Sequence, residues 1–177
     1  MKKIKTKIKG LSIYESKIFY DNRGNVREAF KKDSIKKNLF FSVVSKSKKN
    51  VIRGLHLQIK KPQDKFIGVL KGKILDVVVD LRKNSKTFGK TFRIILSDKN
   101  CLSLYIPEGF AHAYYSFEKI NIVYYKLTNY YKPKFEDGIN LLDKSLKISW
   151  PNKKFSISKK DRKLKSLNYF LKNHKYL

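Results

Sequence analysis

Residues 51–72 constrain the fold more than any other stretch of this sequence. They read Val-Ile-Arg-Gly-Leu-His-Leu-Gln, then a basic bend with a proline, then Asp-Lys-Phe-Ile-Gly-Val-Leu-Lys-Gly. This is the pattern of a strand, a turn and a second strand. Alternate residues of an extended strand share a face, so His56 and Gln58 are expected to point the same way. A second motif, residues 106–112, reads Ile-Pro-Glu-Gly-Phe-Ala-His and ends on another histidine, His112.

Short β-rich segments separated by turn residues continue along the rest of the chain. The dipeptide Gly72-Lys73 marks a predicted hairpin turn within residues 65–82, and Glu118-Lys119 marks another between two later strands. This spacing predicts an all-β sandwich or barrel in one domain, 1–177, with a helix only in the basic tail from about Lys159. Residues 113–117 and 121–130 are predicted strands that are expected to pair, and residues 132–150 are expected to be irregular. The other predicted β segments are 1–20, 26–30, 39–45, 51–59, 87–96 and 102–106.

The charge balance invites a nucleic-acid interpretation that the residue types do not favour. The chain has 177 residues, with 42 Lys plus Arg against 14 Asp plus Glu and a formal net charge of +28. Six of the 42 are arginine, whereas specific readers of nucleic acid rely on arginine for bidentate contacts. A hydrophobic fraction of 41% is enough to build a core. We therefore expect no nucleic-acid partner and attribute the lysines to a drift in composition.

The expected location is the cytoplasm. Cys101 is the single cysteine in the sequence, so no disulfide framework is expected and a reducing compartment suits the chain. No apolar run reaches the roughly 18 residues that would span a bilayer. The N-terminal segment is basic but is not followed by the apolar stretch of a signal peptide. These features predict no membrane insertion.

The two motifs resemble those of the cupins, small jelly-roll barrels in which paired motifs bring side chains into the barrel mouth. Metal-binding cupins carry His-x-His and a Glu in the first motif and Pro-x-Gly-x-x-His in the second. Here Gln58 replaces the second histidine and Lys65 stands at the glutamate position, while His112 is retained. An amide and an ammonium cannot replace an imidazole and a carboxylate around a divalent cation. The resemblance implies a cupin-type jelly-roll barrel with a short peripheral C-terminal helix and no metal, which disfavours a metal cupin oxygenase.

A longer series of segments follows in order along the chain: Arg53–Gln58, Gln63–Lys65, Asp76–Arg82, Thr87–Gly89, Ile106–His112, Tyr125–Tyr131 and Ser149–Pro151. Together these segments resemble the dTDP-4-dehydrorhamnose 3,5-epimerase family over about residues 10–165. The resemblance implies an isomerase, without metal or redox cofactor, that inverts C3, C5 or both in a nucleotide-linked 4-keto-6-deoxy sugar. The C4 ketone acidifies the hydrogens on C3 and C5, so this chemistry needs a base, a group that holds the enolate, and an acid on the opposite face.

The resemblance assigns catalytic roles to particular residues of this chain. It makes His56 the base, which suits an imidazole because imidazoles take up protons near neutral pH. Asp161, in the C-terminal segment Ser-Lys-Lys-Asp, would orient that imidazole. Lys65 would stabilise the enolate oxygen, and Tyr125 would return a proton on the far face. His112 is expected in the same pocket without an assigned role.

Other residues are expected to bind the nucleotide and the sugar. The resemblance makes Arg53 a diphosphate or sugar contact and Tyr130 a contact to the base or diphosphate. Arg23 and Glu28 would reach the nucleotide of a neighbouring subunit in a homodimer that exchanges N-terminal strands. Gln58 and Lys160 complete the expected binding residues.

One departure from the family bears on the substrate. Family members carry Gln-x-Asn-x-Ser before the central strand, and here those places hold Phe41, Val43 and Ser45. Because a site built for particular hydrogen bonds discriminates strongly against ligands that lack them, the usual thymidine-linked substrate is open to question. A C3-only or C5-only epimerase acting on a GDP-linked 4-keto heptose or hexose stays an alternative. A cupin-like protein that binds nucleotide sugars or polyanions without catalysis is the alternative from another class.

Overall fold

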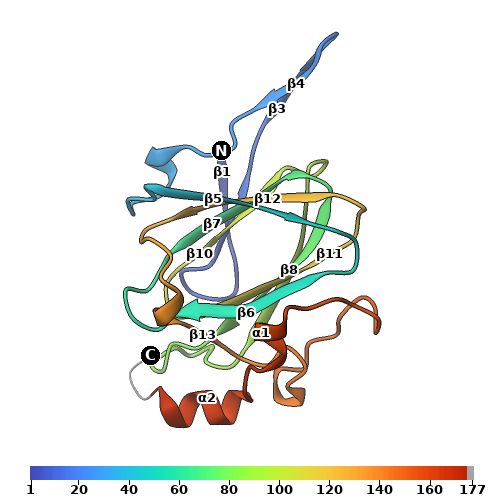
Figure 1. The fold of residues 1–177 in the computed structure, drawn as a ribbon. Helices are drawn as coiled ribbons and strands as arrows, with labels where there is room; N and C mark the ends of the chain where they lie inside the picture. Colours follow the sequence, from blue (N-terminus) through green and yellow to red (C-terminus); the bar gives the residue numbers. More distant parts are fainter. Residues whose placement is uncertain (175–177) are drawn as a thin grey trace.

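A computed structural model describes residues 1–174 and shows two antiparallel sheets packed face to face (Figure 1). The six-stranded sheet has the order β1-β2-β10-β7-β12-β5, and the five-stranded sheet has the order β13-β6-β11-β8-β9. The all-β prediction is confirmed, and the architecture is the predicted cupin-like jelly roll. The strands are β1 Lys2–Lys5, β2 Ser12–Glu15, β3 Ile18–Asp21, β4 Gly24–Arg27, β5 Phe41–Ser47, β6 Ile52–Gln58, β7 Lys65–Lys71, β8 Lys73–Asp80, β9 Thr91–Ser97, β10 Leu102–Ile106, β11 Phe110–Ser116, β12 Asn121–Leu127 and β13 Glu136–Gly138.

The main core fills the space between the two sheets. Apolar residues alternate along the strands, so one face of each sheet supplies the interior. Ile67 and Val69 of β7 face the interior from one sheet, while Ile74 and Val78 of β8 face it from the other, and all four are fully buried. At about 25 cal/mol per Å² of apolar surface, each such side chain contributes roughly 1.5–3 kcal/mol to folding.

Two predicted hairpins are wrong because the chain changes sheet at those turns. Strands β7 and β8 adjoin at Gly72 but lie in different sheets, and the same holds for β11 and β12. Gly72 has a φ of +88°, and a Cβ there would lie 2.5 Å from the carbonyl oxygen of Ile120. The backbone N–H of Lys73 donates to Asn121 Oδ1 at 3.1 Å. The turn between β7 and β8 and the turn between β11 and β12 therefore contact and stabilise each other. Each of these strands pairs with strands other than its neighbour across the turn.

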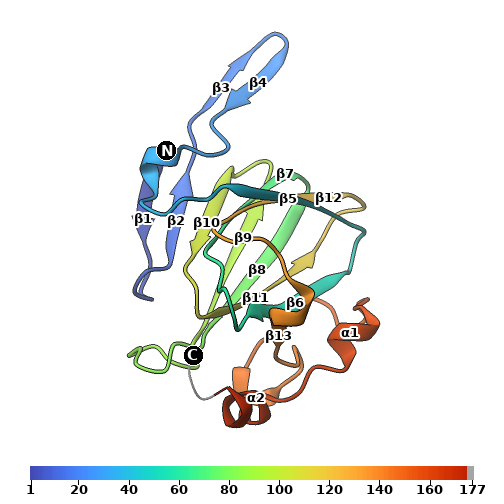
Figure 2. The ribbon, with the colours of Figure 1, turned by 60° about the vertical axis from the view of Figure 1, so that its left-hand side comes forward.

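The predicted strand over residues 1–20 is in fact three short strands. β1 pairs with β2 and forms an exposed edge of the six-stranded sheet. β3 and β4 pair only with each other and project from the body as a separate ribbon (Figures 1 and 2). The ribbon carries large exposed side chains, including Tyr20 at 73% exposure.

The C-terminal segment packs against the five-stranded sheet beside β6. Residues 132–150 are mostly irregular, as predicted, but they also contribute the edge strand β13, which pairs with β6. The helical tail consists of α1, Lys159–Arg162, and α2, Leu167–Asn173. Phe170 of α2 is buried in a second apolar cluster beneath that sheet (Figure 1). The last residues of the predicted tail, 175–177, lie outside the described residues. Within residues 1–174, no helix is long and apolar enough to cross a membrane.

Candidate active site

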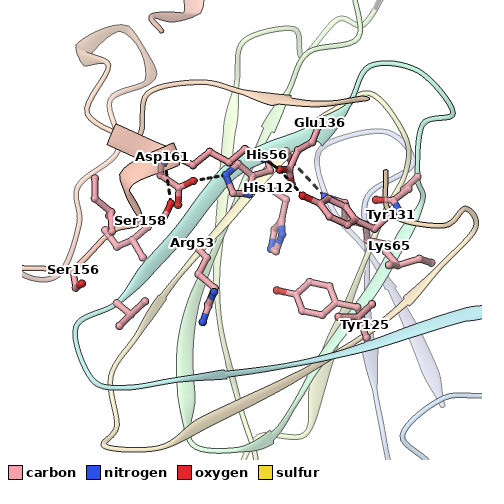
Figure 3. A pocket seen from close by; sticks show the side chains of 17 residues that line it. Arg53, His56, Lys65, His112, Tyr125, Tyr131, Glu136, Ser156, Ser158 and Asp161 are labelled. Atoms are coloured by element: carbon pink, nitrogen blue, oxygen red, sulfur yellow. Dashed lines mark hydrogen bonds and ion pairs between the residues drawn. The ribbon is translucent and has the colours of Figure 1, made fainter. Parts of the chain in front are cut away.

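A pocket of about 490 Å³ opens between β6, β7, β11 and β12, with β13 and the α1 segment at its rim. Figure 3 shows the polar side chains that converge on it. Seven of the residues predicted from sequence line this pocket. They are Arg53, His56, Lys65, His112, Tyr125, Lys160 and Asp161.

His56 and Asp161 form a hydrogen-bonded pair at the top of the pocket in Figure 3, with 2.7 Å between His56 Nε2 and Asp161 Oδ1. β6 supplies the histidine. The Ser158 hydroxyl, the N-cap of α1, accepts the Asp161 backbone N–H and fixes the helix start. Burial raises the pKa of the Asp161 carboxyl, but hydrogen bonds from His56, Ser158 and the Gly54 backbone outweigh that effect and hold the pKa below its usual value. Asp161 is therefore an anion that can only accept from the imidazole.

Glu136 is a second carboxylate beside the same imidazole, and sequence reasoning missed it. Its Oε1 lies 3.6 Å from His56 Nδ1. Its Oε2 accepts the Tyr131 hydroxyl at 3.1 Å and the ammonium of Lys160. Glu136 begins β13 within a segment that has no β periodicity, so local pattern gave no signal for either Glu136 or Tyr131.

Lys65, the first residue of β7, lies on the pocket wall beside His56. Its Nζ is 3.4 Å from the His56 carbonyl oxygen. Burial lowers the pKa of the Lys65 ammonium from 10.5 to about 8, while the negative charges of Glu136 and Asp76 oppose that shift. The ammonium is still mainly protonated at neutral pH, and it supplies a positive charge in a setting poor in water.

A second histidine–aspartate pair lies next to the first. His112 of β11 is the register partner of His56 on β6, and its Nε2 is 2.8 Å from Asp76 Oδ2 on β8. Asp76 is fully buried, and its Oδ1 has no hydrogen-bond partner within residues 1–174. The Asp76 carboxyl thus lies buried behind the pocket wall, where it holds the His112 ring.

Tyr125 lies across the pocket from the His56–Asp161 pair. Figure 3 shows its hydroxyl directed into the open space below His56 and His112. The rings of Tyr125 and His112 meet edge to face with centroids 6.2 Å apart. Burial, with the nearby Tyr114 and Asp76, raises the pKa of the Tyr125 phenol well above its usual value. The phenol is therefore protonated and able to donate.

Arg53 and Gln58 differ in how they relate to the pocket. Arg53 lines it, and its guanidinium donates to the Ser47 hydroxyl at 2.9 Å. Gln58 is buried and does not line it. The Gln58 amide instead donates to the Lys61 carbonyl at 2.9 Å and accepts the Lys132 backbone N–H at 2.6 Å. Gln58 therefore holds two loops together at the pocket rim.

Three other predicted binding residues lie outside the pocket of this single chain. Tyr130 is exposed at the rim, where its ring packs edge to face against Phe41 with centroids 5.1 Å apart. Arg23, at the tip of the β3–β4 ribbon, is 84% exposed and pairs with Asp21 at 2.6 Å. Glu28 follows the ribbon and pairs with the N-terminal ammonium at 3.3 Å.

The residues that replace the family's amides lie on β5. Val43 lines the pocket and is the register partner of Tyr125, while Phe41 contributes to the aromatic contact with Tyr130. Ser45 turns its hydroxyl to the buried Tyr114 hydroxyl at 2.8 Å. This wall of the pocket is therefore apolar at Val43. Within the described residues, no group of three or more His, Cys, Asp and Glu side chains is arranged to hold a metal ion.

The sequence matches the profile of the family described as dTDP-4-dehydrorhamnose 3,5-epimerase over residues 5–169. It is 41% identical to the dTDP-4-dehydrorhamnose 3,5-epimerase of Methanothermobacter thermautotrophicus over 93% of both chains. The chain belongs to the dTDP-4-dehydrorhamnose 3,5-epimerase family. As a member of this epimerase family, it is a carbohydrate epimerase, as the sequence resemblance implied.

Solved structures of this epimerase family have the same fold. A dTDP-6-deoxy-D-glucose-3,5-epimerase from Legionella pneumophila, solved with dTDP-4-keto-L-rhamnose, is 39% identical with a TM-score of 0.90, covering 94% of this chain and 93% of that one. A variant of a 3'-monoepimerase from Streptomyces bikiniensis, solved with dTDP, is 26% identical with a TM-score of 0.90, covering 96% and 89%. Enzymes described as double and single epimerases thus share this architecture.

Proposed function

We propose that this chain inverts C3, C5 or both of a nucleotide-linked 4-keto-6-deoxy sugar, without a metal or redox cofactor. The observation that carries the proposal is the hydrogen-bonded pair of His56 and Asp161, which lies across one pocket from Tyr125 (Figure 3). Lys65 lines the same pocket. Such an arrangement supplies a base on one face of a sugar ring and an acid on the other.

His56 acts as the base in this proposal and Tyr125 as the acid. Asp161 accepts the Nε2–H of His56, which leaves the lone pair of Nδ1 free to take a proton from C3 or C5. The electron pair of the broken C–H bond forms an enolate with the C4 oxygen. Tyr125 then donates its phenolic proton to the carbon from the opposite face, and the configuration inverts.

Lys65 holds the negative charge that develops on the C4 oxygen. The side-chain ammonium of Lys65 has one hydrogen-bond partner within residues 1–174, the His56 carbonyl at 3.4 Å. Because an ammonium has three N–H donors, two are available to bind the enolate oxygen. Groups of this kind contribute strongly where water is excluded. We place His112 beside Lys65 as a second polar contact to the sugar, held in orientation by Asp76.

The nucleotide part of the substrate extends toward the basic and aromatic rim. Arg53 and Lys160 line the pocket and carry charges suited to a diphosphate. Tyr130, which packs with Phe41 at the rim, offers an exposed ring for stacking on a base.

The functional unit in this proposal is a homodimer in which the β3–β4 ribbon crosses to the partner subunit. The ribbon projects from the body and exposes the large side chains Phe19, Tyr20 and Val26. β1 leaves an unpaired sheet edge, which natural proteins usually cover. A partner that covers both would bring Arg23 and Glu28 to a pocket, since neither reaches the pocket of its own chain. A single cysteine suits a reducing compartment, so we propose that this dimer works in the cytoplasm.

A second candidate substrate is favoured by Val43. The relatives act on dTDP sugars according to their names, but the family's amides at 41 and 43 are replaced by Phe41 and Val43. A polar ligand group left unpaired against that wall costs on the order of 1–3 kcal/mol, which is roughly tenfold to a hundredfold in affinity. A GDP-linked 4-keto heptose or hexose is the alternative. Competition between the two substrates decides: ordinary turnover of the dTDP sugar with an inert GDP sugar would show that the change is neutral.

The activity itself is tested by incubating the protein with dTDP-4-keto-6-deoxyglucose, and with the GDP-linked sugars, in deuterated water. NMR of the product should show deuterium and inverted configuration at C3, C5 or both. Tight binding of these sugars without any deuterium incorporation would instead favour a non-catalytic binding protein.

A further inference from the structure

His56 lies between two carboxylates that differ in their distance from it. Nε2 is 2.7 Å from Asp161, whereas Nδ1 is 3.6 Å from Glu136 Oε1. The first distance is a hydrogen bond and the second is too long for one. Because an ionised carboxylate can only accept, Asp161 fixes the proton on Nε2. Nδ1 is therefore the atom that takes the proton from carbon, and Glu136 is the carboxylate beside that proton.

The two carboxylates also differ in their access to water. The Asp161 side chain is 4% exposed and is held as an anion by several hydrogen bonds. The Glu136 side chain, 12% exposed, lies at the rim and pairs with Lys160, whose side chain is 51% exposed. The Lys160 ammonium and the Tyr131 hydroxyl both donate to Oε2, so Oε1 stays directed at the imidazole. A path from Nδ1 to solvent thus runs through Glu136.

A base that acts on every turnover, or twice in one turnover, must lose the proton that it has gained. We propose that Glu136 is the proton-relay residue of this enzyme, taking the proton from His56 Nδ1 and releasing it to water. The inference rests on the proposed function, and it assigns Glu136 a role exerted through His56.

The proton balance of the relay closes over one inversion. Nδ1 forms an N–H bond as the C–H bond of the sugar breaks, and the resulting imidazolium attracts the Glu136 carboxylate across the 3.6 Å gap. The N–H bond then breaks as an O–H bond forms at Oε1, and water takes that proton. Tyr125 gives one proton to the carbon and recovers one from solvent, so the enzyme returns to its starting state.

Glu136→Gln tests the relay, because it keeps the size of the side chain and an oxygen that can accept from Tyr131 but cannot take up a proton. We expect kcat to fall at least tenfold while KM changes by less than about threefold. If the unmodified enzyme inverts both carbons, Glu136→Gln should accumulate sugar inverted at one carbon only. The reason is that His56 loses its first proton slowly and so cannot yet take the second. In Glu136→Ala, added sodium formate should restore at least a third of the lost kcat, with sodium chloride as the ionic control.

Asp137→Asn is the matched control. It removes the same charge from the next residue of β13, where the side chain pairs with His174 Nε2 at 2.6 Å and does not line the pocket. Its kcat and product mixture should equal those of the unmodified enzyme, and thermal unfolding of all variants establishes that each one folds.

Three results would overturn the relay: an unchanged kcat in Glu136→Gln, a rise in KM alone, or a loss in Glu136→Ala that formate does not restore. The second would make Glu136 a contact to the substrate. Failure of the proposed function is seen separately, in the unmodified protein, as an absence of deuterium incorporation, and in that case both proposals fall.

Discussion

Replacing Lys65 with methionine should make the protein more stable and nearly inactive. Methionine matches the length of lysine and removes the charge. The ammonium of Lys65 lies on the pocket wall with one weak hydrogen bond, 3.4 Å from the His56 carbonyl. Folding therefore takes a charge out of water without fully replacing its hydrogen bonds.

The size of the effect follows from the pKa of Lys65. That pKa falls from 10.5 to about 8 in the folded chain, and each unit corresponds to about 1.4 kcal/mol. Keeping Lys65 charged at pH 7 thus costs at most about 3 kcal/mol, an upper value because the Lys65 side chain is only partly buried. The folded pKa is below the unfolded one, so the cost is full below about pH 8 and vanishes as the pH rises to 10.5.

Urea unfolding at pH 7 and at pH 10.5 measures this cost directly. At pH 7, Lys65→Met should raise the free energy of unfolding by up to about 3 kcal/mol, or the melting temperature by roughly 5–10 °C. At pH 10.5 the two proteins should be equally stable. Turnover should drop about a hundredfold or more, the scale for losing an oxyanion donor. Lys71→Met, at the exposed end of the same strand, is the control and should shift stability by less than about 0.5 kcal/mol.

A Lys65→Met variant that is less stable at pH 7, or that gains equally at both pH values, would refute the reasoning from burial. Turnover within threefold of the unmodified enzyme would refute the enolate role.

Three further predictions concern the base, the acid and the assembly. His56→Asn should fold and lose deuterium incorporation at both C3 and C5 in deuterated water, and normal exchange would remove His56 as the base. Tyr125→Phe should still exchange hydrogen with solvent but form little inverted product, so an unchanged ratio of inversion to exchange would assign the acid elsewhere. Light scattering should find a homodimer, and deletion of residues 1–30 should abolish activity, whereas a fully active monomer at the assay concentration contradicts the exchanged ribbon.

Strand pattern together with the cupin resemblance predicted the parts of the pocket that depend on neighbouring strands. Alternation within residues 51–59 predicted only that His56 and Gln58 share a face. The resemblance to the cupin motifs brought His56 and His112 into one pocket, and the register of β6 with β11 places them opposite each other. Lys65, which opens the next strand, came from its place at the glutamate position of the cupin motif. Family resemblance, rather than periodicity, supplied Asp161, which lies 105 residues from His56.

Local pattern failed where the chain changes sheet or leaves regular structure. Gly72 has the residue type of a hairpin turn, yet β7 and β8 separate into two sheets because their best partners lie elsewhere in the sequence. Glu136 was missed for a related reason: the strand that holds it has three residues and owes its existence to the edge of β6. The β-propensity of a short segment does not predict which distant strand that segment will pair with.

In the proposed mechanism, the dependence of His56 on Asp161 makes activity arise late in the folding of the chain. Strand β6 can join its sheet once β8 and β11 are present, but the imidazole is oriented only when α1 docks, 105 residues further on. Closing a loop of that length is entropically expensive before the sheets exist and cheap afterwards. A nascent chain still lacking residue 161 would therefore hold the pocket with its proposed base, His56, unoriented. Activity then reports on docking of the C-terminal segment, and a loss of turnover that precedes loss of the sheets would mark local undocking of α1 as the first step of thermal inactivation.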